Sequence, residues 1–158
     1  DHIYGVNEIL DKFPDCLLFV ANEYGLEGLS DIKQNGSKYT GNVIVINKTE
    51  NVRFLGGKLM LWPQECLTSV VTPGHSDDSV CFIVENLLFT GDTLIKDVRT
   101  VTKIRGGSVE KLEETIRVIE QLKGHGYHVC PGHGEEFDLD EYDLMISVIN
   151  NKNPNLYL

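Results

Sequence analysis

The sequence lacks several features that assign a chain quickly to a class. It has no run of about 18 apolar residues, which a membrane span needs, and no charged-then-apolar start typical of a signal peptide. Basic residues are scarce, because 14 Lys and Arg stand against 24 Asp and Glu, which gives a net charge of -10. Such a surface repels nucleic-acid phosphates and anionic lipid. These absences predict a cytoplasmic protein with neither a nucleic-acid nor a membrane partner.

Closely spaced cysteines are also missing. Cys16, Cys66, Cys81 and Cys130 stand singly inside apolar stretches, and no C-x-x-C pair occurs. Isolated cysteines of this kind are typical of buried thiols in a reducing compartment. We therefore expect four reduced thiols, no disulfide and no cysteine zinc knuckle.

What the sequence does contain is a mixture of strand and helix patterns. Its 158 residues and 41% hydrophobic content suit one domain over residues 1–158. Apolar spacing predicts helices over 6–13 and 108–122 and a last helix from Asp138, where Glu141 completes a capping box. Between them, strands are predicted at "CLLFVAN", "NVIVIN", "VRFLG", "KLMLW", "LTSVVT" and "YHVC", with a hairpin turning at Glu85-Asn86. Strands in series with interleaved helices predict an α/β fold.

Three of these strands end in the same way, on a glycine followed by a side chain able to bind a metal. "VVTPGH" ends at His75, "LLFTGD" at Asp92 and "YHVCPGH" at His133, and the chain opens with Asp1-His2. Each one alone is more often a turn or a helix cap. Together they form the set of imidazoles and carboxylates that zinc and similar ions take, at strand ends where sheets present functional groups.

Two other histidines and one loop have plainer interpretations. His125 lies between two glycines and His128 within a strand pattern, so we expect both to be structural. The stretch Lys96–Arg105 is the most basic in the chain. It either recognises a substrate carboxylate or is a solvated loop.

Taken in order, the motifs "DH", "TPGHS", "LFTGDTLI", "GGSVEKLEETI" and "VCPGHG" resemble those of the metallo-β-lactamase-fold hydrolases, most closely the short glyoxalase II-like (hydroxyacylglutathione hydrolase-like) members. The resemblance implies an αββα sandwich with two metal ions at one edge of its sheets. It further implies that His75 is a ligand of the first metal, that Asp92 bridges both, and that Asp1, His2 and His133 are ligands of the second. Asp77 or Asp78 is a candidate to orient His75 by accepting its other N–H.

The chain departs from the family pattern at its start. The family signature is H-x-H-x-D-H, and the sequence begins at the Asp of that signature. We therefore expect a piece of a longer protein, an incomplete sandwich whose N-terminal strands are missing. Because a catalytic zinc normally has three protein ligands, the first site alone is expected to hold metal poorly and the piece to be inactive.

For the parent protein the resemblance implies a metal-dependent hydrolase acting on a small-molecule thioester or related acyl substrate. Two divalent ions, zinc first and iron or manganese as alternatives, would activate the attacking water, with Asp1 and Asp92 as catalytic residues. Two other functions stay open: a non-catalytic or metal-free binding or structural protein, and an iron-dependent oxidoreductase similar to sulfur dioxygenases. The oligomeric state is not predicted.

Overall fold

The computed structural model describes residues 2–149 and divides the chain into two compact units, one up to Gly56 and one from Gly57. Each unit has its own cluster of buried apolar side chains. No helix within the described range is both long and apolar enough to cross a bilayer.

The first unit is built from short elements. They are α1 (Val6–Lys12), β1 (Leu18–Val20), α2 (Glu23–Gly28), α3 (Ser37–Thr40) and β2 (Val52–Phe54). Strands β1 and β2 pair in parallel, and Leu10 of α1 packs with Val20, Leu29, Ile44 and Ile46. The predicted helix over 6–13 and the strand within "CLLFVAN" are confirmed.

One predicted strand in this unit is wrong. The alternation in "NVIVIN" does bury Ile44 and Ile46 and expose Val43 and Val45, yet residues 42–47 pair with no strand. Asn7 of α1 supplies hydrogen bonds there instead, since its amide donates to the carbonyl of Val45 and accepts from the N–H of Asn47. Alternation of apolar residues indicates which side chains face a core, but it does not show that the segment pairs with a strand. Here the side-chain amide of Asn7 forms hydrogen bonds that a neighbouring strand would otherwise provide.

The second unit is a six-stranded sheet with the order β3-β4-β5-β6-β7-β8. Its strands are β3 (Lys58–Trp62), β4 (Glu65–Val71), β5 (Val80–Val84), β6 (Leu87–Gly91), β7 (His128–Pro131) and β8 (Phe137–Asp138). Neighbouring strands are antiparallel except β6 and β7, which are parallel. The predicted hairpin joins β5 and β6 at Glu85, whose φ of 52° is the left-handed conformation that such tight turns require.

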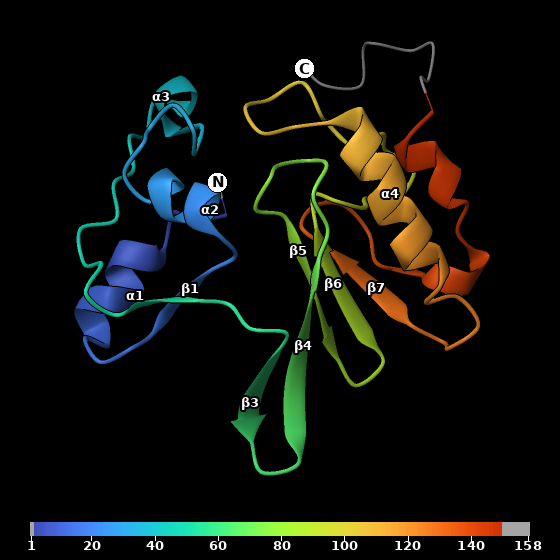
Figure 1. Cartoon of the computed structure of the whole chain (residues 1–158), viewed down its shortest axis with the longest axis horizontal. Coiled ribbons are helices and arrows are strands. Elements are labelled where there is room, and N and C mark those ends of the chain that lie inside the picture. The colour runs from blue at the N-terminus through green and yellow to red at the C-terminus, as the bar shows by residue number, and fades with distance from the viewer. Residues whose placement is uncertain (1, 150–158) are drawn as a thin grey trace. The chain divides into compact units, whose positions relative to one another are not determined.

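Helix α4 (Val109–Glu120) connects β6 to β7 and covers one face of this sheet (Figure 1). Ser108 caps it by accepting a hydrogen bond from the N–H of Lys111, as its side-chain oxygen is suited to do. Leu112, Ile116 and Ile119 face the sheet and are buried, while Glu113 and Arg117 pair at 3.9 Å on the outer face. The predicted helix over 108–122 is confirmed.

The predicted last helix is wrong. Residues after β8 form two short 3₁₀ turns, η1 (Leu139–Glu141) and η2 (Leu144–Ser147), and extended backbone at Tyr142 and Asp143 separates them. The Tyr142 hydroxyl accepts from the N–H of Asp97 at 2.9 Å and donates to the carbonyl of Ile95 at 3.2 Å. Reaching that loop interrupts the helix, and Met145 and Ile149 are about half exposed.

Candidate metal centre

The topology of the second unit brings three of the predicted site residues to one edge of the sheet. Strand β5 is antiparallel to both β4 and β6, so β4 and β6 run the same way, and β7 is parallel to β6. The carboxyl ends of β4, β6 and β7 therefore lie at the same edge. His75 follows β4, Asp92 follows β6 directly, and His133 follows β7.

The two imidazoles face different oxygens of one carboxylate. The Nε2 atom of His75 lies 3.8 Å from Oδ2 of Asp92, and the Nε2 atom of His133 lies 3.6 Å from Oδ1. Both distances are long for a hydrogen bond. Two ligand atoms that are each 2.0–2.2 Å from one tetrahedral ion stand about 3.3–3.6 Å apart. The two distances between imidazole nitrogen and carboxylate oxygen are thus close to those between two ligand atoms of one cation. Asp92 lies between the two histidines.

The orientation of His75 is held from the far side of its ring. Its Nδ1 lies 2.8 Å from the carbonyl oxygen of Val101. Because a carbonyl only accepts, Nδ1 carries a proton, and in the neutral ring Nε2 presents its lone pair toward Asp92. The hypothesis that Asp77 or Asp78 orients this ring is therefore wrong. Asp77 accepts from Lys111 and Asp78 from the hydroxyl of Ser76.

Backbone hydrogen bonds hold the turns that carry Asp92 and His133 together. The N–H of Gly132 donates to the carbonyl of Gly91 at 2.9 Å, which extends the β6–β7 pairing past the strand ends. Gly91 has a φ of 51°, a left-handed conformation that glycine adopts easily because it has no side chain. The hydroxyl of Thr90 donates to the carbonyl of Leu94 and closes the turn around Asp92.

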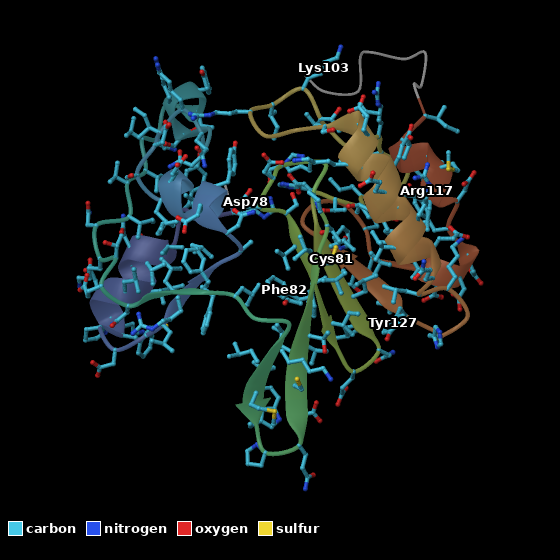
Figure 2. The ribbon with its side chains drawn as sticks, in the orientation of Figure 1. Asp78, Cys81, Phe82, Lys103, Arg117 and Tyr127 are labelled. Atoms are coloured by element: carbon cyan, nitrogen blue, oxygen red, sulfur yellow. The ribbon has the colours of Figure 1, made fainter. Side chains whose placement is uncertain are left out.

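A buried thiol lies beneath this edge but is unsuited to chemistry. Cys81 on β5 belongs to the core between the sheet and α4 (Figure 2). Burial raises the pKa of its thiol to about 11, so the group stays protonated at neutral pH and is neither nucleophile nor metal ligand. All four cysteines are free thiols, but only Cys81 is buried and Cys16 is exposed, so the pattern typical of buried thiols holds for Cys81 alone.

His128 lies at the opposite end of β7 from His133. Its Nδ1 is 2.9 Å from Asp138 and its Nε2 is 3.1 Å from Glu136, so its partners are these carboxylates. His125 lies in the connection between α4 and β7, and its ring is near that of Tyr127. Neither histidine lies at the edge that carries Asp92, which agrees with the prediction that both are structural residues.

The other two predicted ligands, Asp1 and His2, stand at the start of the chain. Asp1 lies outside the described residues, and His2 belongs to the first unit. Their participation stays a prediction. The carbonyl of Val101 was missed by sequence reasoning, because a backbone acceptor in a loop carries no signal in the side-chain pattern.

Comparison with known proteins decides the family. A family model described as the metallo-beta-lactamase superfamily matches residues 1–133. The chain belongs to the metallo-beta-lactamase superfamily. Among its relatives in this superfamily, it is 32% identical over 144 residues to "Probable metallo-hydrolase YqgX" of Bacillus subtilis, covering 88% of the chain and 66% of that protein.

One further sequence relative and one solved structure are also similar to the chain. The chain is 27% identical over 153 residues to a hydroxyacylglutathione hydrolase of Francisella philomiragia, covering 96% of the chain and 51% of that enzyme. The crystal structure of TTHA1623 in a di-iron-bound form superposes with a TM-score of 0.74 at 21% identity, covering 94% of the chain and 70% of TTHA1623. The predicted α/β metallo-beta-lactamase fold is thereby confirmed. The chain spans 66% of the length of the Bacillus subtilis protein and 51% of the length of the Francisella philomiragia enzyme.

Proposed function

We propose that this chain carries the metal-binding edge of a metal-dependent hydrolase that acts on thioesters or related acyl substrates. The observation that carries the proposal is the arrangement at Asp92, whose two carboxylate oxygens face the Nε2 atoms of His75 and His133 at 3.8 and 3.6 Å. A carboxylate shared in this way between two imidazoles is suited to bridge two cations.

The donor set fits divalent metal ions. His75 and Asp92 would hold one ion, and Asp92 and His133 would be ligands of the other. Neutral imidazole and carboxylate suit zinc first, while iron and manganese accept the same ligands, and the di-iron form of TTHA1623 keeps iron in consideration. When bound, such ions lower the pKa of water toward neutrality and polarise a substrate carbonyl.

Hydrogen bonds within the chain orient the proposed ligands in the absence of a metal ion. The Val101 carbonyl selects the tautomer of His75 whose Nε2 is a free donor of electrons. The link between Gly91 and Gly132 sets the separation of the Asp92 and His133 turns. Rigid placement of ligands on strand ends is what binding of a small ion requires, because the geometry tolerates little movement.

The substrate class rests on relatives and on one loop. A relative is named for hydrolysis of hydroxyacylglutathione, a thioester. The loop that bears Val101 also bears Lys103 (Figure 2), and so lies next to His75. In a chain of net charge -10, a cationic loop beside the site favours a substrate with a carboxylate.

The test combines metal analysis with hydrolysis of an acylglutathione. We expect the purified full-length protein to hold zinc or iron in stoichiometric amount and to hydrolyse the thioester. Asp92→Ala removes the shared ligand and should lower both metal content and hydrolysis by more than about 100-fold, since loss of even an outer partner of a metal ligand costs 10–100-fold.

His128→Ala is the matched control, because it removes an imidazole from the opposite end of β7. It should leave metal content and activity nearly unchanged, whereas His133→Ala should reduce both. A wild-type protein that takes up no metal at saturating supply would overturn the proposal in favour of a non-catalytic role. Bound iron with oxygen consumption and no hydrolysis would instead support the oxidoreductase.

A further inference from the structure

Helix α4 contains a threonine where its pattern calls for an apolar residue. Thr115 lies on the same face as Leu112, Ile116 and Ile119 and is only 3% exposed. A buried threonine in a helix ordinarily returns its hydroxyl to a carbonyl of its own preceding turn. Here the hydroxyl donates to the carbonyl of Pro73, 42 residues away in sequence, at 2.7 Å. Pro73 lies two residues before His75.

A second contact fixes the next peptide of the same turn. The N–H of Ser108, the residue that caps α4, donates to the carbonyl of Gly74 at 2.9 Å. The two carbonyls that precede His75 are therefore both bound to residues of the α4 segment: the carbonyl of Pro73 to Thr115, and the carbonyl of Gly74 to Ser108. Hydrogen bonds to two neighbouring peptides leave the intervening backbone little freedom to rotate.

Packing closes this segment onto the helix. A Cβ atom built on Gly74 would lie 2.6 Å from the Cα of Leu112, so only glycine allows this approach. Gly107, just before the helix, likewise has no room for a side chain, because its Cβ would meet the carbonyl oxygen of Thr102 at 2.2 Å. The contacts of Pro73 and Gly74 hold the backbone that leads to His75, and the contact between Nδ1 and the carbonyl of Val101 holds its ring.

We infer that Thr115 is a positioning residue for His75, holding the Pro73–His75 segment so that Nε2 stays aimed at Asp92. The inference rests on the proposed function, in which His75 is a metal ligand. A hydroxyl buried on an otherwise apolar face is explained by this role, because a valine of the same shape would pack equally well but leave the Pro73 carbonyl without this donor.

The experiment compares Thr115→Val, which removes only the hydroxyl's hydrogen bond, with Thr115→Ser, which keeps it. The apparent zinc affinity is measured by competition with a chromophoric chelator. We expect a loss of about 10-fold in Thr115→Val, the scale on which supporting contacts to metal ligands act, and recovery of most of it in Thr115→Ser. Ile119→Val, one turn along the same buried face, loses a methyl group from the core and should keep wild-type affinity.

A readout without metal separates this inference from the proposed function. Nitrogen-15 spectra of the His75 ring in the metal-free protein should show a single Nδ1–H tautomer in the wild type and in Thr115→Ser, and a tautomeric mixture in Thr115→Val. Unchanged affinity together with an unchanged tautomer in Thr115→Val would overturn the inference. A wild-type protein that binds no zinc would overturn the proposed function alone, and the ring spectra would still decide the role of Thr115.

Discussion

At the scale of single residues, the histidines differ by what faces their two nitrogens. His75 has a carbonyl on one side and a carboxylate on the other, and when its Nδ1 donates to the carbonyl, its Nε2 can serve as a ligand of a cation. His128 has a carboxylate on each side, and both nitrogens donate only when the ring is protonated. The same residue type thus supplies a proposed metal ligand at one end of the sheet and a partner of two carboxylates at the other.

His128 should make stability depend on pH. Hydrogen bonds to Asp138 and then Glu136 raise the pKa of its ring above the ordinary value. A raised pKa in the folded state stabilises the fold below the unfolded-state pKa of about 6.5. That contribution is lost as the pH rises through the folded-state pKa. His128→Gln should therefore destabilise more at pH 5.5 than at pH 9 in urea unfolding.

Asp138→Asn removes the first of the two carboxylates and should reproduce part of this pH dependence. A destabilisation by His128→Gln that is equal at both pH values would contradict the role assigned to the charged ring.

At the scale of elements, the segment between β4 and β5 depends on α4 for its shape. Gly74 has a φ of 148° and no space for a side chain beside Leu112, whereas Gly124 has a φ of 83° and open space around its Cα. Gly74→Ala should cost about 2–4 kcal/mol of unfolding free energy from combined overpacking and strain. Gly124→Ala should cost only about 1–2 kcal/mol for its left-handed backbone.

Urea denaturation of the two variants measures this difference, and equal losses would mean that the contact with α4 does not constrain the segment. The comparison also shows why turn glycines of similar appearance in the sequence differ in importance. Gly74 and Gly124 both lie after the end of a helix or strand, but only Gly74 is packed against a neighbouring helix.

Elements were predictable where periodicity was strong and local. The face of α4 and the β5–β6 hairpin follow from side-chain spacing and turn chemistry within a few residues. Prediction failed at 42–47 and after Asp138, where distant groups, the amide of Asn7 and the loop at Ile95, supply or receive the deciding hydrogen bonds. Tertiary contacts override local pattern at such positions.

At the scale of the whole molecule, metal binding should be coupled to stability. An ion that binds the folded state alone stabilises it by RT ln(1 + [L]/Kd), about 2.7 kcal/mol at 100 times Kd. A chelator should therefore lower the thermal midpoint of the metal-loaded protein, and added zinc should restore it. In Asp92→Ala the midpoint should not respond to either treatment, and a chelator without effect on the wild type would contradict the coupling.

The sequence by itself determined the kinds of residue at the strand ends, the buried face of α4 and the acidic surface, because these follow from residue chemistry and short-range spacing. Only the tertiary structure decided that His75 and His133 face the carboxylate of Asp92, since this depends on β4, β6 and β7 running in the same direction. It also decided that the ring of His75 meets the carbonyl of Val101, rather than Asp77 or Asp78, and that the hydroxyl of Thr115 meets the carbonyl of Pro73. Such partners come from distant parts of the chain, and their approach is set by packing rather than by local sequence.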